Sequence, residues 1–191
     1  MKKQISRDEY VLAVLQDDLK HRHSKRLKDE EKLILSPNLD SVEENEKRFQ
    51  LLSRVNGAFS GNILNSFGKF YKTVISKEEF LQLNWCPKGR PESDAIDRMT
   101  ANSRKFSDIL QFIKDKEHCK IEDIEIKKEI SDMERYGKLL EKESAINKRV
   151  YSIKSNSNYY VLDGNHRAGG MIYNIHKLGK YTLFEHFGAE N

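Results

Sequence analysis

The chain has 191 residues, of which 37% are hydrophobic and 34% charged, and its formal net charge is +4. This length suffices for one sizeable domain or for a core domain with an appendage, and so small a net charge does not by itself indicate a nucleic-acid-binding protein. The basic start MKKQISRDEY has no apolar region behind it, and no run approaches the roughly 18 apolar residues of a membrane span. Cys86 and Cys119 form neither a CxxC pair nor a zinc-site spacing, which is typical of free thiols in a reducing compartment. We therefore expect a soluble cytoplasmic protein with no membrane partner.

Residues 1–118 are predicted to be mostly helical. The stretch from Ser6 to Glu9 fits a capping box, and apolar residues follow it at helical spacing. A second cap signal, from Ser41 to Glu44, begins another predicted helix. The apolar positions of these two helices are Val11, Val14, Leu15 and Leu19 in the first, and Leu52, Val55 and Phe59 in the second.

Further along this region, Phe67, Phe70, Tyr71 and Val74 form a stripe that favours a helix. Ser76 to Glu79 repeats the capping pattern and opens a short helix. The segment CPKGRP, residues 86–91, is predicted to be a loop because it holds two prolines and a glycine. The last helix of the region carries Met99, Phe106, Leu110 and Ile113.

The pattern changes near residue 118, where the remaining sequence combines strands with helices. KIEDIEI (120–126) alternates as a half-buried strand or extended segment does, and a helix through Met133 follows. RVYSIKS (149–155) and YYVLD (159–163) predict a hairpin, and Ala168, Met171, Ile172 and Ile175 predict an amphipathic helix ending at Gly179. YTLFEHF (181–187) predicts a final strand. The predicted class is α+β, with a helical region of unknown role (1–118) and a small α+β domain (119–191).

The stretch YYVLDGNHRAGG, residues 159–170, places an acid, an amide, an imidazole and a guanidinium where a strand turns into a helix. A helix start offers unpaired N–H groups and about half a positive charge, so it suits an anion. Gly164 allows close approach of backbone, and the planar fork of Arg167 can hold two phosphate oxygens. His166 can donate a hydrogen bond or move a proton. Asp163 can hold a metal, orient His166 or accept a hydroxyl proton.

A plain structural interpretation competes with this one. In it, Asp163 only caps the helix, Gly164 only forms a turn, and His166 and Arg167 lie in a solvated first turn. The presence of four kinds of polar side chain, an acid, an amide, an imidazole and a guanidinium, within five residues favours a functional site. We also expect Arg167 to project from the first turn with no apolar surface of its own, so that its loss would cost less than about 1 kcal/mol of stability.

The segment VLDGNHRAGG resembles the signature of the ParB/sulfiredoxin superfamily, whose members carry DGxHR-like motifs between a strand and a helix. The resemblance extends over roughly residues 119–187. Members include partition proteins that bind and hydrolyse CTP, sulfiredoxins that use ATP, free-serine kinases that use ADP, and proteins proposed to be nucleases. The resemblance implies a ParB/sulfiredoxin-like α+β domain in which Gly164, His166 and Arg167 hold nucleotide phosphates. Asp163 would shape the turn or hold a magnesium-bound nucleotide.

Two departures narrow what the resemblance implies. Asn165 stands in the region of the sulfiredoxin catalytic cysteine, so we do not expect sulfinic-acid reduction. Partition proteins continue into a helix-turn-helix segment, whereas this sequence ends at Asn191, so we do not expect a full partition protein. The motif is most similar to that of the free-serine kinases, Asp-Gly-x-His-Arg.

Three further residues are secondary candidates. Lys88 and Arg90 lie in the 86–91 loop beside Trp85, where they would cover a phosphate or stack on a base; a surface connector is the alternative. Glu125 would supply a general base if the 120–126 segment ran beside the motif; the alternative is an acid that only solvates a strand edge. The basic run KHRHSKRLK (20–28) fits a solvated helix better than a nucleic-acid contact.

These observations predict a nucleotide-binding protein, and we expect a nucleotide-dependent phosphotransferase or phosphohydrolase. Its ligand would be a nucleoside di- or triphosphate, with Mg²⁺ held by Asp163. Asp163 and His166 would be the catalytic residues, and Gly164, Asn165, His166 and Arg167 would bind phosphate. The alternatives are a non-catalytic nucleotide- or DNA-binding module and a ParB-like nuclease. The sequence leaves open the nucleotide, the acceptor, the metal dependence and the oligomeric state.

Overall fold

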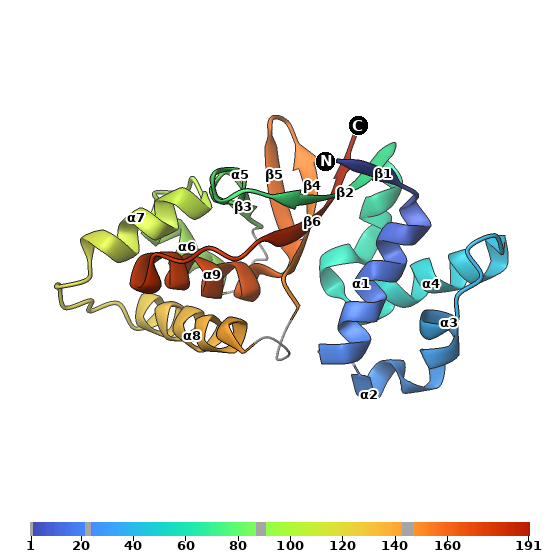
Figure 1. The fold of residues 1–191 in the computed structure, drawn as a ribbon, viewed down its shortest axis with the longest axis horizontal. Coiled ribbons are helices and arrows are strands. Elements are labelled where there is room, and N and C mark those ends of the chain that lie inside the picture. The colour runs from blue at the N-terminus through green and yellow to red at the C-terminus, as the bar shows by residue number, and fades with distance from the viewer. Residues whose placement is uncertain (1, 22–23, 87–90, 143–146) are drawn as a thin grey trace. The chain divides into compact units, whose positions relative to one another are not determined.

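The computed structural model describes residues 2–21, 24–86, 91–142 and 147–191, and Figure 1 shows their helices and strands. In chain order the elements are β1 (Lys3–Ile5), α1 (Arg7–His21), α2 (Ser24–Leu27), η1 (Lys28–Glu30), α3 (Glu31–Leu35), α4 (Val42–Val55), η2 (Gly57–Ser66), β2 (Lys69–Ile75), α5 (Lys77–Leu81), β3 (Asn84–Trp85), α6 (Pro91–Thr100), α7 (Phe106–Asp115), α8 (Ile124–Glu141), β4 (Arg149–Ser155), β5 (Asn158–Asp163), α9 (Asn165–Leu178) and β6 (Phe184–Glu190). The described strands form a mixed six-stranded sheet in the order β1-β2-β6-β4-β5-β3. The predicted α+β class is confirmed.

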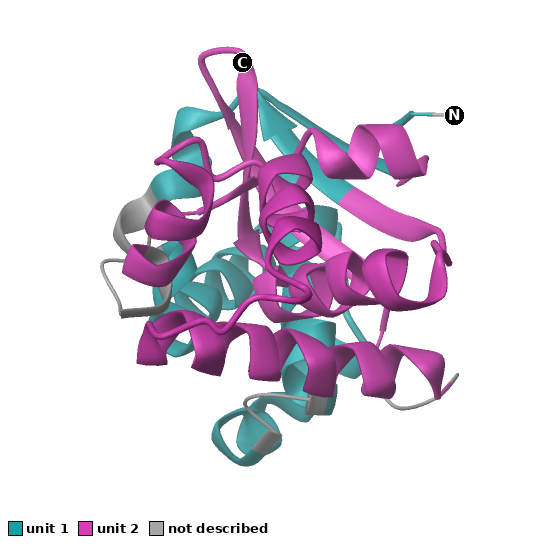
Figure 2. Cartoon of the chain, turned by 90° about the vertical axis from the view of Figure 1, so that its left-hand side faces the viewer, with its two compact units in different colours: residues 1–73, 187–191 teal, residues 74–186 magenta. Residues whose placement is uncertain are grey.

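The chain divides into two compact units, drawn in different colours in Figure 2. Unit 1 comprises residues 1–73 and 187–191, and unit 2 comprises residues 74–186. The boundary predicted near residue 118, between a helical region and an α+β domain, lies inside unit 2. Side chains from both sides of that point share one core there, since Phe80, Trp85 and Phe106 belong to the same buried cluster as Val161 and Ile172.

The core of unit 1 is built around Tyr10, which is fully buried on α1. Its ring makes edge contacts with Phe59, Phe70 and Phe187 at centroid distances of 6.3, 5.5 and 6.4 Å. The capping box that was predicted ahead of α1 is present, because Glu9 N–H donates to Ser6 Oγ at 3.0 Å and Ser6 N–H donates to Glu9 Oε2 at 2.6 Å.

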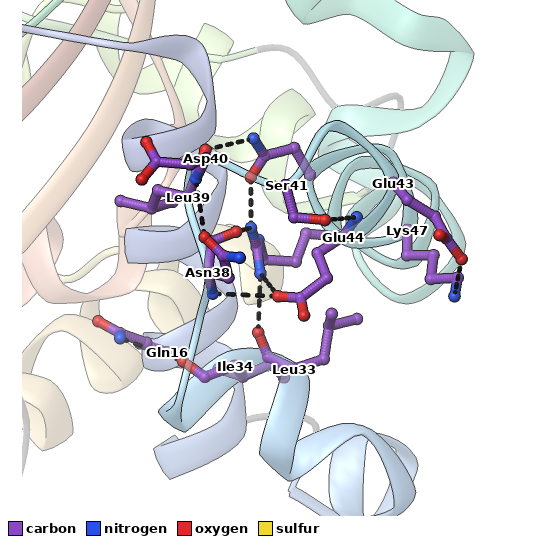
Figure 3. A network of polar contacts seen from close by, with 12 residues as sticks. Gln16, Leu33, Ile34, Asn38, Leu39, Asp40, Ser41, Glu43, Glu44 and Lys47 are labelled. Atoms are coloured by element: carbon purple, nitrogen blue, oxygen red, sulfur yellow. Dashed lines mark hydrogen bonds and ion pairs between the residues drawn. The ribbon is translucent and has the colours of Figure 1, made fainter.

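Unit 1 also contains a fully buried arginine, Arg48 on α4. Its guanidinium donates to the carbonyl oxygens of Leu33 (3.2 Å) and Asn38 (3.0 Å) and to Glu44 Oε2 (3.2 Å), and it contacts Asn45 Oδ1. Figure 3 shows the surrounding network, in which Asn38 N–H also donates to Glu44. These bonds attach the segment between α3 and α4 to the side of α4.

Unit 2 contains the predicted hairpin, with β4 and β5 antiparallel and Tyr151 opposite Asp163. The short strand β3 runs parallel to β5, with Trp85 opposite Val161. Helices α8 and α9 lie side by side (Figure 1), and glycines lie at their contact. Among the described residues, no helix is both long enough and apolar enough to cross a membrane.

Several predicted elements differ in the structure; the single helix predicted through Met99 and Ile113, for example, is two helices, α6 and α7. Phe70, Tyr71 and Val74 of the predicted stripe lie in strand β2, and Phe67 precedes that strand. Aromatic and β-branched residues suit a pleated surface, so the helix predicted there is wrong. The extended segment predicted at 120–126 is a helix from Ile124 onward. Asp123 caps that helix by accepting hydrogen bonds from the N–H groups of Glu125 and Ile126, and this local bond outweighs the alternating pattern.

Candidate functional site

The candidate site is the turn from Asp163 to Arg167, which connects β5 to α9. Gly164 precedes the helix with φ +95°, a left-handed conformation that favours glycine. A β-carbon on Gly164 would lie 2.7 Å from the carbonyl oxygen of Arg149 and 3.2 Å from Arg167 Nη2. Gly164 supplies no side chain to cap α9, so no side-chain cap is formed at this helix start. The turn therefore brings an uncapped helix start close to β4.

Asp163 and Arg167 form an ion pair inside this turn. Arg167 Nη2 lies 3.1 Å from Asp163 Oδ2, and the two side chains are only 11% and 10% exposed. The expectation that Arg167 projects freely from the first turn is therefore wrong. One turn of helix separates residues four apart, so a guanidinium at Arg167 reaches back to the last residue of β5. In this conformation Asp163 satisfies the charge of Arg167.

Two buried polar atoms of the turn have no hydrogen-bond partner among the described residues, Arg167 Nε and Asn165 Oδ1. Asn165 is 4% exposed, and its Nδ2 donates to the carbonyl oxygen of Val161 at 3.0 Å. The side-chain N–H group of Asn165, predicted to bind phosphate, thus donates within the protein. The atom of Asn165 without a partner is its oxygen, which can only accept a hydrogen bond. Buried groups in native proteins are nearly always paired, so water or a ligand is expected at such a place.

His166 is exposed on the first turn of α9, yet aromatic rings contact it from two other elements. Its ring stacks on Tyr136 of α8 at a centroid distance of 5.2 Å and an interplanar angle of 13°. Trp85 of β3 makes an edge contact at 6.4 Å and 89°. Trp85 lies in a segment that the sequence had singled out, whereas Tyr136 was missed.

A close helix contact brings Tyr136 to His166. A β-carbon on Gly170 would lie 2.6 Å from the backbone nitrogen of Gly137 and 2.6 Å from the carbonyl carbon of Tyr136. Asn174 Nδ2 donates to the carbonyl oxygen of Gly137 at 3.0 Å. The glycines in ERYGK and RAGG are therefore the sequence signal for this contact, because only small residues let two helix backbones approach so closely.

A second ion pair lies beside the turn and was also missed. Arg149 Nε donates to Glu185 Oε2 at 2.6 Å, and the two side chains are 29% and 31% exposed. Arg149 is the residue whose carbonyl oxygen faces Gly164. Each partner lies on a separate strand, and no local spacing in the sequence relates them.

The secondary candidates have separate outcomes. Lys88 and Arg90 lie outside the described residues. Because β3 and β5 are parallel, the carboxyl end of β3 lies at the same end of the sheet as the turn. Glu125 Oε2 is bound by Arg98 Nη2 at 2.5 Å at the first turn of α8, about 16 Å along that helix from Tyr136. Glu125 therefore does not converge on the turn.

For Asp163, the predicted ligand of a nucleotide-bound Mg²⁺, that role stays a prediction. One of its carboxylate oxygens is bound by Arg167, and the described residues contain no cluster of three or more His, Cys, Asp or Glu side chains suited to a metal ion. No step of the chemistry considered below is therefore assigned to a metal.

Two surface depressions lie elsewhere in the described parts of the chain. One, of about 390 Å³, follows the outer face of α8 around Arg135 and Lys138. The other, of about 480 Å³, lies in unit 1 between Leu33 and Arg54. Neither contains a residue of the 163–167 turn, so neither bears on the predicted site.

The chain was compared with protein-family models, with curated proteins and with solved structures, and no significant match was found in any of the three. The resemblance of residues 119–187 to the ParB/sulfiredoxin superfamily therefore remains a prediction, which depends on the motif and on the order strand, turn, helix.

Proposed function

We propose that the turn from Asp163 to Arg167 binds the phosphate groups of a nucleotide, as the free-serine-kinase-like motif implies. The observation that carries the proposal is Arg167 Nε, a buried donor without an acceptor among the described residues, at the uncapped start of α9. An unsatisfied buried donor costs about 1–3 kcal/mol. An anion at the helix start would supply an acceptor and would also interact favourably with the helix dipole.

In this proposal the ion pair opens when phosphate binds. The guanidinium of Arg167 turns from Asp163 toward the phosphate and binds it through two donors. Asp163 then becomes available to accept a proton from an attacking hydroxyl group or water, which it cannot do while Arg167 occupies Oδ2. His166, which is exposed, donates to the phosphate or moves a proton near neutral pH. The reaction class is phosphoryl transfer or phosphate-ester hydrolysis.

The competing function is a module that binds a nucleotide without chemistry. It uses the same turn, the same Arg167 and the same helix start, but needs no proton acceptor. The two functions differ in the role of Asp163. If the protein is an enzyme, Asp163→Asn removes turnover. In a binding module the same substitution removes the competing ion pair, and nucleotide binding is retained. A ParB-like nuclease is the third alternative, which the resemblance implies.

Binding is tested by isothermal titration calorimetry with inorganic phosphate, ADP and ATP, with and without Mg²⁺. We expect His166→Ala to weaken binding about two- to tenfold, the equivalent of one hydrogen bond. Asp163→Asn should bind phosphate as tightly as the wild type or more tightly, because it no longer competes for Arg167. His118→Ala, an exposed histidine after α7, is the matched control and should not change binding.

The proposal is overturned if the wild type binds none of these ligands, if His166→Ala binds them with unchanged affinity, or if Asp163→Asn no longer binds them although it retains its fold. Turnover is followed separately, by release of ADP or phosphate from ATP in the presence of candidate hydroxyl acceptors. Denaturant melts of each variant establish that the fold is retained.

A further inference from the structure

The exposed ring of His166 is confined by two rings that come from other elements. Exposed side chains usually exchange between rotamers. Here the ring plane lies nearly parallel to Tyr136 and perpendicular to the indole of Trp85. A histidine held in one orientation at a solvent-accessible helix start is what a site needs when it must present one nitrogen to a ligand.

The two confining rings are not equivalent. Trp85 is 3% exposed and belongs to the hydrophobic core of unit 2, so its position follows from core packing. Tyr136 is half-buried on α8, and its place depends on the contact of Gly137 with Gly170. Tyr136 therefore covers one face of the His166 ring, but it contributes less than Trp85 to the packing of the hydrophobic core.

The ring of Tyr136 is also contacted by Arg135, its neighbour on α8. The guanidinium of Arg135 lies 4.5 Å from the centroid of the Tyr136 ring, and Arg135 Nη2 donates to Asp132 Oδ1 at 3.0 Å. The hydrogen bond to Asp132 raises the pKa of Arg135, and a guanidinium is charged at neutral pH in any case, so the group over the ring is a cation. The order of contacts is thus Asp132, Arg135, Tyr136 and His166.

We propose that Tyr136 is a positioning residue that orients His166 toward the ligand bound at the start of α9. For the identity of that ligand, the inference rests on the proposed function. Stacking and not hydrogen bonding carries the effect, so the aromatic ring is required and the hydroxyl group is not. Aromatic pairs of this kind are modest in strength. Loss of the ring should therefore weaken ligand binding without removing it.

The first test compares ring-lacking and ring-retaining variants. Tyr136→Met keeps apolar volume but removes the ring, and Tyr136→Phe keeps the ring. Titrated with ATP and Mg²⁺, and separately with inorganic phosphate, Tyr136→Met should bind about three- to tenfold more weakly. Tyr136→Phe should bind like the wild type. The control is Tyr173→Met, which replaces a half-buried tyrosine at the same pair of helices, about two turns from His166.

The second test observes His166 directly by NMR and needs no ligand. In the wild type and in Tyr136→Phe, the ring protons of His166 should show nuclear Overhauser contacts to Trp85 and an upfield ring-current shift. Both signals should weaken in Tyr136→Met. If Tyr136→Met does not fold, Tyr136→Leu replaces it in both tests.

The outcomes separate the inference from the proposed function. If the wild type binds neither ATP nor phosphate, the proposed function fails, and the contacts of His166 in the NMR spectra still test whether Tyr136 orients the ring. If the wild type binds but Tyr136→Met binds equally well and retains the contacts to Trp85, the inference fails alone. Equal weakening in Tyr136→Phe and Tyr136→Met would also overturn it, because the ring would then not be the cause.

Discussion

Arg167 Nη2 lies 3.1 Å from Asp163 Oδ2, and both side chains are about nine-tenths buried. Removing one partner of such a pair leaves an uncompensated buried charge. We expect Arg167→Ala to lower the free energy of unfolding by about 3–5 kcal/mol. The double variant Asp163→Asn, Arg167→Met should recover part of this loss. Urea unfolding of the three proteins measures both effects. A loss below about 1 kcal/mol in Arg167→Ala would show that the pair contributes as little as a surface contact.

Gly164 and Gly179 bound α9 at its two ends, and both have positive φ. A β-carbon on Gly164 would lie 2.7 Å from the carbonyl oxygen of Arg149, whereas a β-carbon on Gly179 would meet nothing within 4 Å. We therefore expect Gly164→Ala to cost about 2–4 kcal/mol, from strain and overlap together, and Gly179→Ala to cost about 1 kcal/mol from strain alone. Thermal melts of the two variants make the comparison. Equal losses would contradict the close approach of Arg149.

Gly170 lies where α9 contacts α8. A methyl group there would lie 2.6 Å from Gly137 N, so the helices must separate, and we expect Gly170→Ala to destabilise the protein by about 1–3 kcal/mol. The separation would also move Tyr136 away from His166. Gly57→Ala, where an added methyl group meets nothing within 4 Å, serves as the control. Denaturant unfolding tests the loss, which should be absent in the control.

Local signals were sufficient for much of this fold. The capping boxes at Ser6 and Ser76, the 149–163 hairpin and helix α9 were predicted correctly, because each depends on residues within a few positions of one another. Strand β2 was not, since aromatic residues at spacings of three and four also fit a helix, and only pairing with a distant strand decides between them.

The residues of the candidate site could be predicted from the sequence motif, but their burial and their tertiary contacts could not. The glycine turn and the helix start follow from the order of residues, whereas the burial of Arg167 does not. Tyr136 and Trp85 reach His166 from α8 and β3, so their roles depend on tertiary packing. Glycines spaced along two helices were the one local sign of that packing.

Arg48 is the largest side chain that is fully buried in the described part of the chain. It donates to Leu33 O, Asn38 O and Glu44 Oε2, so Arg48→Met should leave several acceptors without a donor. We expect a loss of about 3 kcal/mol or more in the free energy of unfolding. Lys47→Ala removes a neighbouring exposed ion pair with Glu43 and should cost less than about 0.5 kcal/mol. Similar losses for both variants, measured by urea unfolding, would argue against a structural role for Arg48.

His176 in the last turn of α9 is expected to make stability depend on pH. Its side chain is 5% exposed, and its Nε2 lies 3.5 Å from Glu117 Oε1, too far for a good hydrogen bond. Burial lowers the pKa of His176 below its ordinary value of 6.5, and the nearby Glu117 opposes this shift only in part. The unfolded chain therefore binds a proton more readily than the folded one, so stability is complete above about pH 6.5 and falls as the pH drops toward the folded pKa.

His176→Gln removes the titrating group and should unfold with a smaller loss of stability between pH 7.5 and 5.5. Urea unfolding at several pH values within this range, for the wild type and the variant, measures the difference. The other imidazoles are common to both proteins, so their contributions cancel in the comparison. If attraction to Glu117 outweighed burial, the folded pKa would be raised instead, and the wild type would gain stability relative to His176→Gln on acidification. That opposite slope is the result that would contradict a buried, neutral His176.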